Sequence, residues 1–284
     1  MEKEKLISGL FFLFIFLPGV VSEAIPQEPE QTISDFSLSG FGEDGKRTWE
    51  ISGKSADIFP DLIKLNDFLG EIYDQEMITV VADRGDFDKT QDKVHLENNV
   101  VITTESGVEL TTDYLDWDRT TSQILSEAPV DIKKDNVVLS GAGMKGNTNL
   151  KQVDLERDVR LEIDNKKNKI VITCTGPLKI NYAENVAVFN EDVFVDDGQS
   201  KMYADLMEVF FETSASDSSV SSFTGGMGKV AQVVARGNVK IAREGNISFS
   251  NEAVYKASDR TITLIGRPKL IIYPTEDMDA FTGD

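Results

Sequence analysis

The 284-residue chain has very few of the residues on which most enzyme chemistry depends, with one cysteine, Cys174, and one histidine, His95. A single cysteine cannot form an intramolecular disulfide, a thiolate metal cluster or a CxxC redox pair. A catalytic triad, a common zinc site or a histidine acid/base pair would each have to be built around one imidazole ring. The composition therefore predicts no catalytic residues, no metal site and no cofactor.

Both residues are better explained as parts of strands. Cys174 lies in the run Val-Ile-Thr-Cys-Thr, which is typical of a strand, and it is too far from the N-terminus to be lipidated there. His95 stands between Val94 and Leu96, so in a strand it lies on the opposite face from these apolar neighbours. We expect a buried thiol and a solvent-facing imidazole.

Two other motifs fail as catalytic or nucleotide sites. Asp116 and Asp118 flank Trp117 as a glycosidase pair might, but acidic residues flank Phe87 in the same way, so the pattern belongs to a repeat. The glycine run 225–228 lacks the Lys and Ser/Thr of a phosphate loop and closes a serine-rich insertion that starts near Ser214. We interpret it as a loop.

Basic residues are also scarce relative to acidic ones, with 29 Lys and Arg against 49 Asp and Glu and a formal net charge of -20. Such a potential repels nucleic acid and anionic membrane surfaces, so no nucleic-acid partner is expected. A charged surface of one sign also hinders edge-to-edge pairing of sheets.

The first 24 residues differ from the rest. Two lysines precede the apolar run from Leu6 to Val21, which at 16 residues is shorter than the ~20 of a spanning helix. Small residues follow, so the pattern predicts a secretory signal cleaved after Ser22 or Ala24, or an uncleaved anchor formed by residues 6–21. The chain is exported in either case. Residues 25–31, rich in Pro, Glu and Gln, resemble a short tether.

Amphipathic helical stripes are absent beyond residue 24, and the best candidate, Asp57 to Leu69, is interrupted by Pro60. A repeat stands in their place: an aromatic or turn residue is followed thirteen positions later by a Val or Pro that opens a new apolar alternation. Successive repeats lie about 30 residues apart, which is typical of a long stacked structure. The pairs are Phe87 and Val100, Trp117 and Val130, Gly146 and Val159, and Tyr255 and Pro268.

Within each repeat the apolar residues are two apart, which is strand periodicity. Polar clusters between them predict strand reversals, so we expect a meander of antiparallel strands. Leu110 and Thr112 share one parity, whereas Leu115 and Trp117 share the other, and this change predicts a bulge or corner that bends the sheet. A bent sheet can close as a sandwich or stay open as an apolar trough, and periodicity does not choose between them. The expected reversals are at residues 89–92, 104–107, 133–136, 243–246 and 258–260.

Several segments together carry a resemblance to a family. Trp49-Glu50-Ile51, residues 81–88, 96–100, 107–117 and 140–144 resemble the LptC family in order and spacing. Residues 235–241, 253–255 and 264–270 are similar to the related LptA/OstA repeats.

The resemblance implies an all-β fold, an elongated antiparallel meander folded as a V-shaped β-taco or β-jellyroll in two consecutive modules. The expected divisions are a signal or anchor at 1–24, a tether at 25–31, an LptC-like module at 32–165, a connecting segment at 166–184, an LptA/OstA-like module at 185–274 and a tail at 275–284.

It also implies function: a lipopolysaccharide-binding component of the periplasmic Lpt bridge, accepting lipid from an inner-membrane ABC transporter and passing it toward the outer membrane. Expected partners are the acyl chains of lipopolysaccharide, that transporter and an LptA-like protein joined by edge-strand pairing. Candidates for the apolar wall that binds lipid are Val100, Ile102, Leu110, Leu115, Trp117, Val130, Ile132, Val159, Val239, Ile241 and Leu270.

Two alternatives remain open on the residues alone. A closed β-solenoid or sandwich would serve as an exported scaffold with a dry core and no lipid. A carbohydrate-active β-protein would need carboxylates and aromatics clustered on an exposed face.

Overall fold

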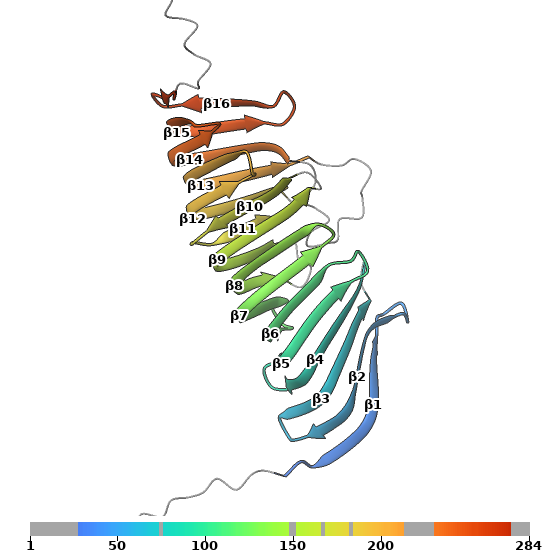
Figure 1. Cartoon of the computed structure of the whole chain (residues 1–284). Helices are drawn as coiled ribbons and strands as arrows, with labels where there is room; N and C mark the ends of the chain where they lie inside the picture. The colour runs from blue at the N-terminus through green and yellow to red at the C-terminus, as the bar shows by residue number, and fades with distance from the viewer. Residues whose placement is uncertain are drawn as a thin grey trace, which may run out of the picture.

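The computed structural model describes residues 28–73, 76–147, 152–165, 168–181, 184–212 and 230–273. Across these ranges the protein is all-β, with seventeen strands in one sheet and no helix. Figure 1 shows the strands stacked into an elongated body, with β1 at one end and β16 at the other. None of the described ranges contains a helix able to span a membrane. The expected signal or anchor and the loop near residues 214–228 lie outside them.

The strands are mostly 10 to 14 residues long, and the shorter ones fall in two rows near the middle and the end of the chain. They are β1 (Gln31–Phe41), β2 (Arg47–Ile58), β3 (Leu62–Tyr73), β4 (Met77–Asp88), β5 (Lys93–Thr104), β6 (Glu109–Asp118), β7 (Gln123–Lys134), β8 (Val137–Asn147), β9 (Gln152–Asn165), β10 (Asn168–Cys174), β11 (Leu178–Asn181), β12 (Val186–Asp196), β13 (Ser200–Phe211), β14 (Val230–Arg243), β15 (Asn246–Lys256), β16 (Thr261–Ile265) and β17 (Lys269–Ile271).

The strands pair antiparallel in chain order, so the expected meander is confirmed, and its reversals lie at the expected polar clusters. Two rows are split: β10 and β11 together fill the place between β9 and β12, and β16 and β17 both pair with β15. Since β10 and β11 lie within the expected connecting segment 166–184, hydrogen bonding continues through it. The division into two modules stays a prediction.

Most strands bend near their middle, as the change of parity in β6 predicts. The pairing register shifts between Glu97 and Val100 on β5 and between Arg236 and Val239 on β14. At these shifts the backbone takes positive φ, 52° at Asn99 and 47° at Asn238. Asparagine tolerates that conformation better than most residues, so the polar pairs before each valine are where the chain turns the corner.

The bends align along the sheet and divide it into two facing walls. On β5, residues 93–97 lie in the first wall and residues 100–104 in the second. Polar cross-strand bonds accompany the bends: Asn99 Nδ2 donates to Asp83 Oδ2 at 2.8 Å, and Asn238 Nδ2 donates to Asp205 Oδ2 at 2.8 Å. The same bond therefore occurs at the bend in two distant rows.

The thirteen-residue repeat marks the inside of the bend. Its three valines, Val100, Val130 and Val159, follow the corner directly and are at most 1% exposed, whereas Pro268 in the fourth pair is exposed. Between β7 and β12 the two walls pack tightly on each other, which closes the interior to solvent. The side chains of this closed middle with at most 1% exposure include Ile132, Leu139, Met144, Leu155, Leu178 and Phe189.

Candidate functional site: an apolar chamber between the walls

At the N-terminal end the walls part and leave a cavity of about 610 Å³, here named the N-terminal chamber. That volume lies within the range of small-molecule sites. Both walls of β1 to β7 contribute, and the lining is overwhelmingly hydrophobic. It includes Ile33, Phe36, Leu38, Trp49, Ile51, Ile58, Ile63, Leu65, Phe68, Ile72, Ile78, Val80, Phe87, Val94, Leu96, Ile102, Leu115, Trp117 and Ile124.

Glycines on adjacent strands make room for the aromatic lining. A Cβ added at Gly40 would collide with the Trp49 ring, and one at Gly53 would lie 3.0 Å from Phe36. A Cβ at Gly85 would lie 3.3 Å from the Phe68 ring. Large rings therefore lie flat against the sheet where the facing residue has no side chain.

Three charged residues stand among the lining side chains. Arg119 is in the turn that ends β6 and forms an ion pair with Asp92, with Nη1 3.1 Å from Oδ1. Glu50 and Glu71 belong to the second wall, on β2 and β3. Because Glu50 lies between Trp49 and Ile51, and Glu71 between Gly70 and Ile72, strand alternation points both carboxylates to the outer face of that wall.

The two carboxylates already have partners. Glu50 forms an ion pair with Arg47 and accepts a hydrogen bond from the Ser37 hydroxyl at 2.6 Å. Glu71 accepts one from the Tyr73 hydroxyl at 2.5 Å, and this bond is the main cause that raises the pKa of Tyr73.

The eleven residues predicted to form a lipid-binding wall lie in three different parts of the structure. Ile102, Leu115 and Trp117 line the chamber. Val100, Leu110, Val130, Ile132 and Val159 are at most 4% exposed within the main core. Val239 belongs to a second cluster with Ile241 packed against it, and Leu270 is 58% exposed. A lipid contact by any of the eleven remains a prediction.

The sequence reasoning missed most of the chamber, because its candidates began at Val100, where the repeat is clearest. The chamber is mainly built from β1 to β4, with Phe36, Trp49 and Phe68 among its largest side chains. One local pattern in the sequence could have identified part of the chamber: Ile63 and Leu65 are two apart, as on one face of a strand, and both line it.

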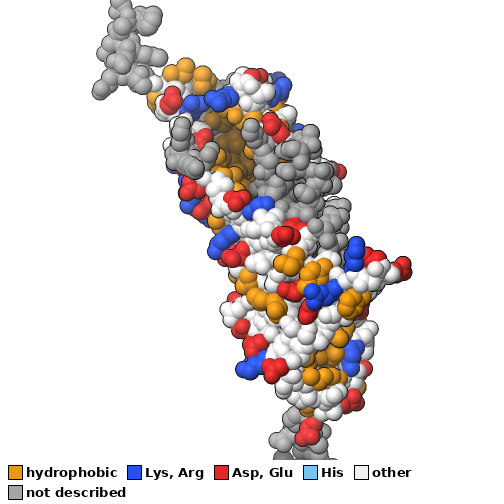
Figure 2. Space-filling model, turned by 90° about the vertical axis from the view of Figure 1, so that its right-hand side faces the viewer, with side chains coloured by type: hydrophobic (Ala, Val, Ile, Leu, Met, Phe, Trp, Pro, Cys, Tyr) orange, Lys and Arg blue, Asp and Glu red, His pale blue; other side chains and the backbone are white. Residues whose placement is uncertain are grey.

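A second apolar region lies at the other end of the sheet. Figure 2 shows a hollow lined by hydrophobic side chains near the end formed by β14 to β16. The buried cluster at this end consists of three alanines and Val239, with Ile241 and Leu264 packed against it. Short alanine side chains fill less of the space between walls than the leucines and phenylalanine of the closed middle.

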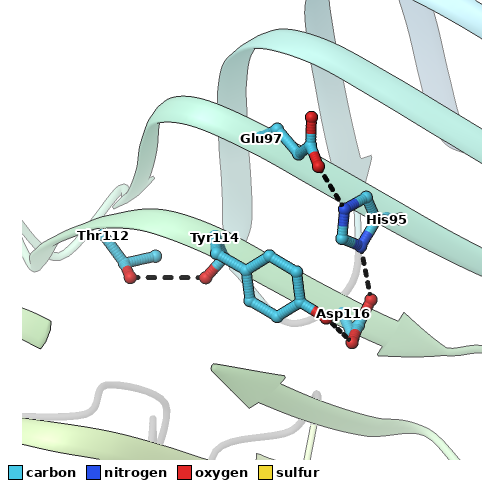
Figure 3. Close-up of polar contacts among 5 residues, drawn as sticks. All are labelled: His95, Glu97, Thr112, Tyr114 and Asp116. Carbon is cyan, nitrogen blue, oxygen red and sulfur yellow. Dashed lines mark hydrogen bonds and ion pairs between the residues drawn. The ribbon is translucent and has the colours of Figure 1, made fainter. Parts of the chain in front are cut away.

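His95 faces outward on β5, as expected, and it has partners there (Figure 3). Its Nδ1 lies 2.7 Å from Asp116 Oδ1 and its Nε2 lies 2.9 Å from Glu97 Oε1. Tyr114 packs edge-on at a ring separation of 4.6 Å and donates its hydroxyl to Asp116. Partial burial lowers the pKa of His95, but the bonds to Asp116 and Glu97 outweigh it, so this pKa is raised overall.

Neither this cluster nor Cys174 has the form of a catalytic site. The hydrogen bond to Asp116 raises the pKa of Tyr114 to about 12, so its phenol stays protonated near neutral pH. Burial raises the pKa of the Cys174 thiol to about 11, which keeps it protonated and weakly nucleophilic. No group of three or more His, Cys, Asp or Glu suited to a metal occurs in the ranges that the structure covers.

These features define a class, a folded antiparallel sheet whose two walls enclose an apolar chamber. The family model "Lipopolysaccharide-assembly, LptC-related" matches residues 7–164, more than half of the chain. The chain belongs to this family, and its role is therefore in lipopolysaccharide transport.

The similar solved structures include that of LptH from Pseudomonas aeruginosa, described as the LptA homologous periplasmic component of the conserved lipopolysaccharide transport device. The identity is 16%, the alignment covers 69% of this chain and 95% of LptH, and the TM-score is 0.19. Curated protein sequences gave no significant match.

Proposed function

We propose that this protein is a periplasmic lipopolysaccharide-binding component of the transport bridge, and that the N-terminal chamber holds acyl chains of the lipid. The chamber is the observation that carries the proposal. Each methylene removed from water contributes ~0.8 kcal/mol, so chains enclosed between two apolar walls bind without catalytic or charged contacts.

The proposal includes a hand-over of lipid between proteins. The chain accepts lipid from an inner-membrane ABC transporter and passes it toward the outer membrane through an LptA-like partner, while ATP hydrolysis is done by the transporter. Two sheet edges support such pairing: among the described strands, β1 pairs only with β2, and β16 and β17 pair only with β15. An unpaired edge can bind a strand of another protein through its backbone.

Exposed hydrophobic residues lie at both edges. Leu38 and Phe41 on β1 are 57% and 66% exposed, and Ile272 and Tyr273 beyond β17 are 57% and 55% exposed. Large apolar side chains on a sheet edge favour association with a partner. The pattern supports pairing at both ends of the sheet.

The test is lipid capture by the full-length chain expressed in a lipopolysaccharide-producing host and examined by native mass spectrometry. We expect bound lipopolysaccharide with the wild type. Ile102→Asp, which places a charge in the chamber, should abolish capture while circular dichroism still reports a β-sheet.

Thr103→Asp is the matched control, because the neighbouring side chain is exposed on the opposite face of β5. It should retain the lipid. Ile241→Asp tests whether the second apolar region also takes part. A stably folded wild type that carries no lipid would contradict the proposal and favour the exported scaffold, for which the closed middle is the supporting observation.

A further inference from the structure

A row of aromatic and lysine side chains crosses the outer face of the sheet near its C-terminal end. These five residues, here named the aromatic-lysine row, are joined in one line by the cross-strand register: Phe194 on β12, Tyr203 on β13, Lys240 on β14, Phe249 on β15 and Lys269 on β17. Because the strands stack along the length of the molecule (Figure 1), the row runs in that direction.

Strand alternation turns the row away from the interior. Val193 and Val239, which directly precede Phe194 and Lys240, are each 1% exposed. Successive side chains of a strand point to opposite faces, so the members of the row point outward, and Tyr203 is 42% exposed. The row therefore lies on the other side of the wall from any lipid held between the walls, and its ligand is a different molecule.

The contacts within the row leave positive charge on the surface. The Phe194 and Tyr203 ring centroids lie 4.9 Å apart, and Lys240 Nζ lies 5.4 Å from the Tyr203 centroid. Among the described residues neither Lys240 nor Lys269 forms an ion pair, whereas Lys201 on the same face does. On a chain with a formal net charge of -20, uncompensated cations beside exposed rings favour an anionic ligand with apolar faces.

The spacing of the row favours a polysaccharide over a peptide. Adjacent strands lie ~4.8 Å apart, whereas an extended peptide repeats every ~3.3 Å and falls out of step with the row. A sugar residue in a linear polysaccharide is about one strand spacing long. Sugar rings also pack their C–H faces on aromatic rings, whose faces are electron-rich, and Phe249 offers a 37% exposed ring between two lysines.

Acidic residues beside the row disfavour a flat anionic membrane. Asp196 and Asp205 lie on the same face, two positions from Phe194 and from Tyr203. A membrane would bring its headgroups against both carboxylates, and like charges repel, whereas a narrow polymer contacts the row alone. The row itself contains no carboxylate, so it lacks the acid/base pair of a glycosidase and is suited to binding.

We propose that the aromatic-lysine row is a docking surface for a linear polysaccharide that carries carboxylates. Its sugar rings pack against Tyr203 and Phe249, and its carboxylates bind Lys240 and Lys269. This goes beyond the proposed function, because it gives the outer face of the sheet a ligand of its own.

The experiment is isothermal titration calorimetry of the full-length chain at low salt with four hexamers. Hexagalacturonate has sugar rings and carboxylates, cellohexaose has the rings without charge, hexaglutamate has the carboxylates without sugar rings, and hexathymidylate is an anionic nucleic acid. We expect hexagalacturonate to bind at least about tenfold more tightly than each of the others.

Two variants, each with a matched control, assign the binding to the row. Lys240→Gln should weaken hexagalacturonate binding about fivefold, whereas Lys179→Gln removes an exposed lysine from β11 and should change nothing. Phe249→Leu should weaken it about threefold, because the ring is lost, whereas Phe41→Leu replaces an exposed phenylalanine on β1, at the other end of the sheet. Circular dichroism checks that each variant keeps its β-sheet.

Several outcomes would overturn the proposal. An equal loss in Lys179→Gln would assign the effect to general surface charge. Equally tight binding of hexaglutamate or hexathymidylate would indicate a peptide or a nucleic acid, and equally tight cellohexaose would show that charge is irrelevant. Binding of no hexamer would also contradict the proposal. Lipid capture by the same variants should equal that of the wild type, so failure of the docking surface leaves the proposed function intact.

Discussion

At the scale of single residues, the titration of His95 can be measured directly and tests the geometry around it. It faces Glu97 on its own strand, Asp116 and Tyr114 on β6, and Asp86, its register partner on β4. The net effect raises its pKa above the ordinary value. Because the chain has a single histidine, its imidazole gives one resolvable NMR titration. We expect a midpoint above ~6.5 in the folded protein.

The raised pKa of His95 also determines how the free energy of unfolding changes with pH. A raised folded pKa means that protonation favours folding, so the stabilisation by His95 is present below the unfolded pKa and is lost as pH rises through the folded one. His95→Gln should lower the free energy of unfolding at pH 5.5 and change it little at pH 8.5, as measured by urea titration. Asp116→Asn should lower the NMR midpoint more than Asp86→Asn, which removes a charge without a hydrogen bond. Equal shifts would contradict the assigned geometry.

At the scale of elements, the bend is the feature that makes a folded sheet from straight strands. Asn99 has positive φ and bonds to Asp83 on β4. Asn99→Val should destabilise the protein by about 2 kcal/mol, because a β-branched residue resists this conformation and the bond is lost. Asn99→Gly should cost less than about 1 kcal/mol, since glycine adopts the conformation freely.

Thr103→Val is the control for this pair of variants, because it lies on the same strand in extended backbone and should change the stability little. Urea unfolding followed by circular dichroism measures all three. A valine at position 99 that costs no more than glycine would show that the backbone strain at the bend is unimportant.

The same element explains how far the sequence could predict the structure. The bend depends on residues that are close in the chain, because polar residues that accept positive φ stand directly before a buried valine. The repeat and the parity change in β6 therefore predict it. The chamber depends on facing walls. Whether Phe68 meets Gly85 or Trp49 meets Gly40 is decided by pairing between strands, and no local pattern records how far two walls stand apart.

At the scale of the whole molecule, net charge opposes compactness. The formal net charge of -20 means that the excess acidic side chains repel one another. Salt reduces this repulsion, because the screening length falls from ~30 Å at 0.01 M to ~10 Å at 0.1 M. Exposed ion pairs also weaken with salt, but they contribute little each. We expect potassium chloride to raise the melting temperature by about 2–5 °C, with sucrose of equal osmolality as the control. A decrease with salt would mean that the ion pairs dominate.

The contrast between the open N-terminal chamber and the closed middle yields the last prediction. Ile102 on β5 is half-buried and lines the chamber. Ile132 lies two strands away on β7, in the same cross-strand row, and is 0% exposed in a filled core. An aspartate at position 132 must bury a carboxylate with no space for water, so Ile132→Asp should cost more than about 4 kcal/mol and prevent stable folding. Ile102→Asp places its charge where solvent or a displaced ligand can reach it, and it should cost about 1–2 kcal/mol. Urea unfolding of the two variants measures the difference directly. Equal costs would mean that the walls close over the chamber as tightly as they do in the middle, and acyl chains would then have no preformed place to bind.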